Sequence, residues 1–143
     1  MNESMERVSE LFRVAPFIRH LNIIPTDAGV GWCEGHMEVR AEHLQQHGYV
    51  HAGVVTTLAD HNTGAASFTA VPQGFDVITI EYKMNFLRPA IGPILYCRGD
   101  VLRAGKTIVV AESCVFSDFP DRGRVLVAKC VSTLSVIPLT RGR

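Results

Sequence analysis

The sequence predicts an α+β fold in which one long helix packs against one curved antiparallel sheet. Two observations lead to this class. Residues 53–69 repeat apolar side chains at the 3.6-residue period of an α-helix. Four strand-like segments then follow without another helix between them. Because short turns join consecutive strands in antiparallel order, the second half of the chain is expected to supply most of the sheet.

The chain has the length and composition of a globular protein. Its 143 residues suit one domain, expected over 1–143 with an N-terminal helical segment at about 4–21 and a core at about 22–138. Hydrophobic residues make up 47% and charged residues 20%, which excludes a disordered chain. Fourteen basic residues balance fourteen acidic ones, so no overall charge recruits nucleic acid or an anionic membrane. No apolar run approaches the roughly 20 residues that span a bilayer.

The N-terminal elements are read from spacing. Residues 4–13 place apolar side chains at helical intervals, and Ser4 can serve as the N-cap. Pro16 can open a second short helical turn that runs through Leu21, because proline is tolerated at the first helical position. From 30 to 40, polar and apolar residues alternate with a period of two, which predicts one strand with one solvated face.

After the long helix, which Pro72-Gln73-Gly74 ends, the pattern is that of strands. A tight hairpin is expected at Ala104-Gly105, and a broader turn at 118–123. The four strands are expected at about 76–88, 93–103, 106–117 and 124–137.

The first of these strands has a regular alternation. Its apolar residues are Ile78, Ile80, Tyr82, Met84 and Phe86, and its polar residues are Thr79, Glu81, Lys83 and Asn85. Successive side chains of a strand point to opposite faces of the sheet. The five apolar side chains are therefore expected to point inward together, and the four polar ones outward.

Cysteine usage and the N-terminus indicate a cellular compartment. Cys33, Cys97, Cys114 and Cys130 are widely spaced in strand-like surroundings, without a Cys-x-x-Cys pair. Buried, reduced thiols are the expected state. Residues 1–6 are acidic and lack the apolar core of a signal peptide. Together these features predict a cytoplasmic protein.

The most informative stretch is residues 45–60. It places a polar, glycine-containing loop directly before a helix of small apolar residues, and Asp60 lies nine residues after His51, about two and a half turns further along. The N–H groups at a helix start attract developing negative charge. A carboxylate within a buried helix is costly unless it is solvated or has a partner. The combination is typical of an active site for attack on a carbonyl carbon.

Three histidines in this region have a spacing that could suit a metal. His43, His47 and His51 lie at i, i+4 and i+8, which on a helix would place them on one face. Gly48 and the β-branched Val50 weaken a helix there, and no carboxylate or cysteine is placed to complete the set. We therefore expect no metal site.

Other chemistries lack their motifs. The sequence contains no Gly-x-Ser-x-Gly, no plausible Cys/His nucleophile pair and no phosphate-binding loop. Gly105-Lys106-Thr107 matches only the last fragment of such a loop. We expect His51 to fix the loop through a ring N–H bond, and His61 to be a polar residue on the side of the helix.

In this order and spacing, the residues resemble the hotdog-fold thioesterases, specifically the PaaI-like branch of phenylacetic acid degradation. The resemblance runs from about Pro16 to Pro138. Its markers are His51-Ala52-Gly53 where the family has His-Gly-Gly, Leu58-Ala59-Asp60, Thr79-Ile80-Glu81, Asn85-Phe86-Leu87-Arg88-Pro89-Ala90 and the Gly105-Lys106 hairpin.

The resemblance implies an assembly and a substrate. The sheet would wrap the long helix, two subunits would pair edge strands into one continuous sheet, and the active sites would lie at the dimer interface. A homotetramer, as a dimer of dimers, is expected. The substrates would be acyl-CoA thioesters, so that coenzyme A is part of the substrate and no further cofactor is needed.

The resemblance also implies catalytic roles. Asp60 would attack the thioester carbonyl or deprotonate a water that does so; a solvated helix aspartate is the alternative. The Ala52 and Gly53 N–H groups would stabilise the oxyanion. Ala52 departs from the family's glycine, but its main-chain donor survives unless the position needs a positive φ angle.

Gln45 and Thr79 match the family's polar site residues less closely than Asp60 does. Gln45 stands where many relatives carry an asparagine that contacts the carbonyl or the attacking water, and its amide is one methylene further out. It can equally be a surface glutamine. Thr79 matches the Ser/Thr that in relatives reaches across from the second subunit to orient water. Threonine is also common in strands for propensity alone.

Substrate binding is expected at three regions. Arg88, Arg103 and Lys106 match regions that in relatives grip the nucleotide end of coenzyme A, although cations beside turns are common without a ligand. The full set of expected substrate-binding residues is His51, Phe86, Leu87, Arg88, Pro89, Arg103, Gly105 and Lys106.

The expected activity is hydrolysis of an acyl- or aryl-CoA thioester. Two alternatives stay open at this point. The departures at Ala52 and Gln45 motivate a non-catalytic acyl-CoA-binding module. The same fold hosts hydratases and dehydratases, and His51 with Asp60 could form the dyad typical of such enzymes.

Overall fold

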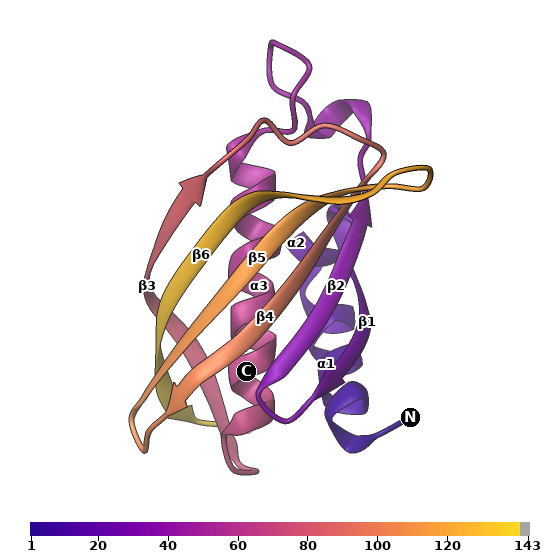
Figure 1. The fold of residues 1–143 in the computed structure, drawn as a ribbon. Helices are drawn as coiled ribbons and strands as arrows, with labels where there is room; N and C mark the ends of the chain where they lie inside the picture. The colour runs from indigo at the N-terminus through magenta and orange to yellow at the C-terminus, as the bar shows by residue number, and fades with distance from the viewer. Residues whose placement is uncertain (141–143) are drawn as a thin grey trace.

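The long helix α3 (Ala52–Ala70) lies against a single curved sheet, as the sequence predicts. The computed structural model describes residues 1–140. Its six strands are all antiparallel and lie in the order β1-β2-β4-β5-β6-β3, and Figure 1 shows the sheet curving around α3. The strands are β1 (Ile24–Gly29), β2 (Trp32–Glu38), β3 (Phe75–Phe86), β4 (Ile94–Ala104), β5 (Ile108–Phe119) and β6 (Gly123–Pro138). The predicted α+β class is confirmed.

The N-terminal helix α1 (Glu3–Val14) is capped two residues earlier than predicted. The side chain of Asn2, not that of Ser4, accepts a hydrogen bond from the Met5 N–H at 2.8 Å. Ser4 is wrong as the N-cap because Asn2 already satisfies the third helical donor, which leaves Ser4 inside the first turn.

Two short helical segments follow. As predicted, Pro16 stands at the first position of α2 (Pro16–His20), and Leu21 is its C-cap residue. A 3₁₀ turn, η1 (Ala41–His43), leads from β2 into the loop before α3.

The predicted strand over residues 30–40 is present as β2, but β1, which forms a hairpin with it, was not predicted. Val30 and Gly31 make the turn between β1 and β2, with Gly31 at φ 81°. A positive φ angle at glycine lets the chain reverse. The pattern of β1 does not signal a strand, because it contains Pro25. Proline is tolerated here because β1 is the outermost strand on its side of the sheet.

Small residues let the sheet approach α3 closely. A Cβ atom on Gly99 of β4 would lie 2.6 Å from the Asn62 carbonyl oxygen, so only glycine fits there. The helix buries Leu58, Ala65 and Ala66 against the strands. Within the part of the chain that the structure describes, no helix combines the length and apolarity that crossing a membrane requires.

The predicted inward face of β3 is correct for Tyr82, Met84 and Phe86 but wrong for Ile78 and Ile80, because the strand contains a bulge. Thr79 pairs with Leu134 and Glu81 pairs with Thr133 of β6, which leaves Ile80 as an extra residue. One extra residue shifts every later side chain to the other face of the sheet.

The bulge has opposite effects on the two halves of β3. Before it, Val77 and Thr79 face α3, whereas Ile78 and Ile80 turn outward and are each 57% exposed. After it, the side chains that face the helix are Tyr82, Met84 and Phe86. Sequence alternation alone cannot reveal the bulge, because the ladder with β6 determines it.

The remaining strands agree with the predictions to within two residues. The Gly105 N–H bonds the Ile108 carbonyl at 2.8 Å and closes the predicted β4–β5 hairpin. Cys33, Cys97 and Cys130 are buried free thiols, as predicted, whereas Cys114 is partly exposed.

Candidate active site

At the start of α3, the Gly53 N–H forms a hydrogen bond and the Ala52 N–H, among the described residues, does not. His51 is the N-cap, and its Nδ1 accepts the Gly53 N–H at 2.8 Å. The ring was expected to fix this loop by donating, but it does so by accepting, because an N-cap satisfies orphan helix donors. Within residues 1–140, the Ala52 N–H has no acceptor. Of the two expected oxyanion donors, Ala52 is the one that is available.

The departure from glycine at Ala52 leaves this donor in place. Ala52 is the first residue of α3. Among the non-glycine residues that the structure describes, only Asn22 has a positive φ angle. Ala52 therefore needs no glycine-like conformation.

Asp60 is half-buried and held by one hydroxyl. Its Oδ1 accepts a hydrogen bond from the Thr79 Oγ1 at 2.9 Å. Burial raises the pKa of Asp60 above its ordinary value, and the Thr79 hydrogen bond partly opposes that rise. Thr79 was expected to act from the second subunit, but it contacts Asp60 of its own protomer, because the bulge at Ile80 leaves it facing α3.

Asp60 lies between two cavities. The central cavity, about 710 Å³, is bounded by α3 at Ala52, Thr56 and Asp60 and by β3 at Tyr82 and Phe86. The inner cavity, about 150 Å³, is lined by Asp60, Thr79 and Gly64. A Cβ atom on Gly64 would meet nothing within 4 Å, so the absence of a side chain there leaves the inner cavity open.

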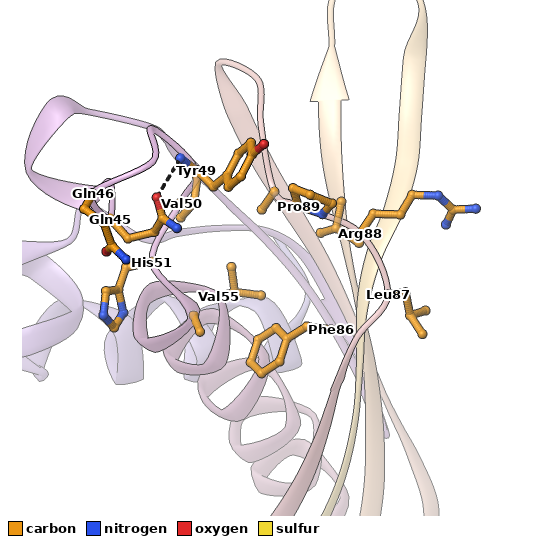
Figure 2. A pocket seen from close by; sticks show the side chains of 13 residues that line it. Gln45, Gln46, Tyr49, Val50, His51, Val55, Phe86, Leu87, Arg88 and Pro89 are labelled. Carbon is orange, nitrogen blue, oxygen red and sulfur yellow. Dashed lines mark hydrogen bonds between the residues drawn. The ribbon is translucent and has the colours of Figure 1, made fainter.

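A third space, the entry cavity of about 490 Å³, adjoins the central cavity through Ala52 and Phe86. Figure 2 shows Phe86 and Val55 near the start of α3, with Tyr49 and Pro89 further out. The expected substrate residues His51, Phe86, Leu87, Arg88 and Pro89 all line the entry cavity. The three cavities form a row with the Ala52 N–H at one junction and Asp60 at the other.

Gln45 lines the entry cavity but has a structural task. Its Oε1 accepts the His47 N–H at 2.6 Å and the Tyr49 N–H at 3.2 Å, the second of which is drawn in Figure 2. These bonds hold the loop before α3 in shape, so its side-chain oxygen is already engaged. A contact with substrate or water is left to its NH₂ group.

Arg103, Gly105 and Lys106 do not join these cavities within one protomer. They lie at the β4–β5 hairpin, at the opposite end of the sheet from the start of α3 (Figure 1). β4 begins at Ile94 and runs for 11 residues, about 35 Å, before it reaches the hairpin. Within one protomer, Arg88 therefore lies apart from Arg103 and Lys106, because strand direction separates the two ends of the sheet, and their common role in substrate binding stays a prediction.

His61 is a residue of this site that sequence reasoning missed. It was expected to be a polar residue on the side of the helix, yet it lines both the central and the inner cavity next to Asp60. Its ring packs edge-on against Phe12 of α1 at 4.3 Å between centroids. Burial lowers the pKa of His61 to about 4, so the ring is neutral at pH 7. The only sequence signal was its position after Asp60, since the contact with α1 is long-range.

The three histidines considered for a metal have separate roles. The buried His43 accepts the Arg40 N–H through Nδ1 at 2.9 Å, whereas His51 caps α3. Across residues 1–140, no three side chains of metal-ligating type lie together.

Comparison with known proteins identifies the family. Residues 47–122, which contain the start of α3, Asp60 and Thr79, match the sequence model of the thioesterase superfamily. The chain belongs to the thioesterase superfamily. The match covers α3 and β3, which supply Ala52, Asp60 and Thr79 to the row of cavities in this thioesterase-superfamily protein.

Solved structures confirm the predicted hotdog fold. A thioesterase family protein from Silicibacter pomeroyi is 29% identical, with a TM-score of 0.91 over 95% of this chain and 99% of that one. The PaaI protein of Escherichia coli shares the fold at 20% identity, with a TM-score of 0.85 over 96% of this chain and 95% of that one. A Saccharolobus solfataricus protein named as a candidate esterase is 27% identical over 138 residues, 96% of this chain and 95% of the relative.

Proposed function

We propose that this protein hydrolyses acyl-CoA thioesters to a free acid and coenzyme A. The observation that carries the proposal is that the free Ala52 N–H and the Asp60 carboxylate border one cavity. A thioester carbonyl placed between them would direct its oxygen to the helix start and its carbon to the carboxylate. A preorganised N–H at that oxygen is often the largest electrostatic contribution to acyl transfer.

Two routes use these groups. As a general base, Asp60 takes a proton from water while the water oxygen bonds to the carbonyl carbon, and the C–S bond then breaks to release the thiolate. As a nucleophile, Asp60 forms a mixed anhydride that water hydrolyses after the thiolate leaves. In both routes the Ala52 N–H donates to the tetrahedral oxyanion, and Thr79 keeps the carboxylate oriented.

The row of cavities suggests how the substrate lies. The entry cavity suits the pantetheine arm, and the inner cavity suits the acyl group beyond Asp60. A cavity of about 150 Å³ can accommodate benzene. A short acyl or aryl group is therefore the proposed acyl class.

Two observations bear on the alternatives from the sequence. The binding-module alternative was motivated by the departures at Ala52 and Gln45. Ala52 retains its main-chain donor, and Gln45 retains its NH₂ group for substrate or water, although its oxygen is engaged by the loop. The hydratase alternative needs His51 and Asp60 to act together, yet they line different cavities, and the His51 Nδ1 is engaged by Gly53.

Thiol release from a panel of aryl-, short- and long-chain acyl-CoAs tests the proposed function. We expect turnover of the aryl and short-chain substrates, with enoyl-CoA hydration absent from the same preparations. Binding of acyl-CoA without thiol release across the panel would contradict hydrolysis and would favour the binding module.

The acid limb of the pH profile tests the environment of Asp60. The limb of kcat/KM is expected above the ordinary aspartate pKa of about 3.9, because burial disfavours the carboxylate. Thr79→Val removes the hydroxyl that stabilises the charged form, so the limb is expected to move to still higher pH. Thr79→Ser retains the hydroxyl and serves as the control. A limb that Thr79→Val leaves in place would show that this contact does not act on Asp60 in the working enzyme.

We further propose that two subunits pair through β3. β3 is an outermost strand, and Ile78 and Ile80 project outward from it. Unpaired edge strands are templates for pairing with another chain. Such a pair would close the cavities beside β3, and association of two pairs into a tetramer stays a prediction.

Ile80→Lys is expected to convert the assembly to monomers and to lower turnover at least about tenfold, because charge repels charge across a two-fold axis. Light scattering after size exclusion, together with thiol release, measures both effects. Ile24→Lys on β1, the opposite edge, is the matched control, since Ile24 is also exposed. Equal assembly masses for the wild type and Ile80→Lys would contradict pairing through β3.

A further inference from the structure

We infer that the Thr56 hydroxyl is a further catalytic group of this site, which holds the attacking water against the Asp60 carboxylate. This inference rests on the proposed function and deepens it, because it assigns the position from which water reaches the thioester. Thr56 is not one of the residues expected from the resemblance, and nothing in the local sequence pattern distinguishes it.

Thr56 lies midway between the two groups that the proposed reaction uses. On α3 it follows Ala52 by four residues and precedes Asp60 by four residues. Residues four apart on an α-helix lie on one face, with about 5–6 Å between their Cβ atoms. All three residues line the central cavity. The Thr56 side chain therefore borders the same space as the Asp60 carboxylate, one helical turn nearer to the Ala52 N–H.

The hydroxyl of Thr56 is free, unlike the other threonine hydroxyls of α3. Each of the others donates to a main-chain carbonyl of the helix, which is the usual way in which a helical threonine satisfies its hydroxyl. These are Thr57, Thr63 and Thr69, which donate to the carbonyls of Gly53, Asp60 and Ala66 at 2.8, 2.8 and 2.7 Å. Across residues 1–140, the Thr56 hydroxyl has no such partner.

The Asp60 carboxylate has one oxygen left for a water. Its Oδ1 accepts the Thr79 hydroxyl at 2.9 Å, whereas its Oδ2 has no hydrogen bond within the described residues. Thr79 lines the inner cavity and Thr56 the central one, so the two threonines border Asp60 in different cavities. In residues 1–140, the buried side-chain polar atoms that lack a partner all belong to other residues. The Thr56 Oγ1 and the Asp60 Oδ2 are therefore both open to a water molecule.

One water fits between these two oxygens. A water that bonds to each at about 2.8 Å can bridge groups up to roughly 5.5 Å apart, which matches the spacing of side chains four residues apart on a helix. A bridging water needs at least two polar partners and enough room. Thr56 and Asp60 are the two partners, and the central cavity, about 710 Å³, has the room.

A water held in this way is oriented for attack. One of its O–H groups donates to the Asp60 Oδ2 and the other to the Thr56 Oγ1, which leaves an oxygen lone pair free for the thioester carbonyl. Asp60 takes the first proton while the water oxygen bonds to the carbonyl carbon, whose own oxygen becomes the oxyanion. The C–S bond then breaks, and the proton passes from Asp60 to the leaving thiolate. Of the two proposed routes, Thr56 therefore favours the general-base route.

Thr56→Val tests this role, because it removes the hydroxyl and preserves the β-branched shape. It is expected to lower kcat for acyl-CoA about tenfold with KM unchanged, since the lost hydrogen bond holds water and not substrate. Thr56→Ser retains the hydroxyl and should restore most of the turnover. Thr57→Val is the matched control. Thr57 borders the same cavity, but its hydroxyl is already engaged by the Gly53 carbonyl, so its removal should have a much smaller effect on kcat.

Crystallography provides a second measurement that does not need turnover. Crystals of the wild type without substrate are expected to show an ordered water within hydrogen-bond distance of both the Thr56 Oγ1 and the Asp60 Oδ2, and crystals of Thr56→Val to lack it. An empty position in the wild type would overturn the inference, as would equal kcat values for the wild type and Thr56→Val or an equal loss in Thr57→Val. If the water is present but no thioester is hydrolysed, the proposed reaction fails while the water site stands.

Discussion

Asp60→Asn is expected to lower kcat by about 10²–10⁴-fold while the protein stays folded, because an amide can neither accept the proton of water nor attack the carbonyl. Asparagine has nearly the same shape, and its Oδ1 can keep the hydrogen bond from Thr79. Thiol release under saturating acyl-CoA measures the loss. Asp27→Asn, on β1, removes a carboxylate outside the row of cavities and should leave kcat unchanged.

The same substitution has a predicted effect on stability. Since burial raises the pKa of Asp60 in the folded state, the folded protein holds this proton more tightly than the unfolded chain does. The free energy of unfolding therefore falls as pH rises from the ordinary aspartate pKa through the raised one. Above that window, Asp60→Asn should have an equal or higher melting temperature, which thermal unfolding at pH 7 measures. For turnover, an Asp60→Asn variant with a kcat within a few-fold of the wild type would exclude Asp60 as base or nucleophile.

Ala52→Pro is expected to lower kcat about 10²–10³-fold, because proline removes the only unengaged N–H at the start of α3. The helix should survive, since proline is favoured at the first helical position. His51 has φ −58° and ψ 137°, which is the extended conformation that a residue before proline requires. Stopped-flow or steady-state thiol release gives kcat, and helical circular dichroism reports the fold.

Ala52→Gly is the control for the proline variant. Glycine retains the N–H and restores the residue that the family usually has, so kcat should stay close to that of the wild type. If Ala52→Pro retained full activity, the oxyanion would have to use another donor, and Gly53 could serve only after His51 releases its N–H. In that case, a His51 variant whose side chain cannot accept the Gly53 N–H should have the same kcat as the wild type.

Local periodicity is sufficient to predict most of the elements. Residues 53–69 repeat at 3.6 and the last three strands alternate at two, so α3 and β4 to β6 were predicted within two residues of their bounds. β1 was missed because it is a short edge strand that contains Pro25, and an edge strand buries too little of either face to show an alternation.

The sequence was sufficient to predict a site made of the loop, the helix start and Asp60. These parts lie within 16 consecutive residues, which run from the loop through the N-cap into one helix. The contact of Thr79 with Asp60 depends instead on the bulge at Ile80, which exists only in the ladder with β6. Likewise, the distance between Arg88 and Arg103 follows from strand direction. Helical and strand periods are properties of neighbouring residues, whereas register and strand order arise from pairing between distant segments.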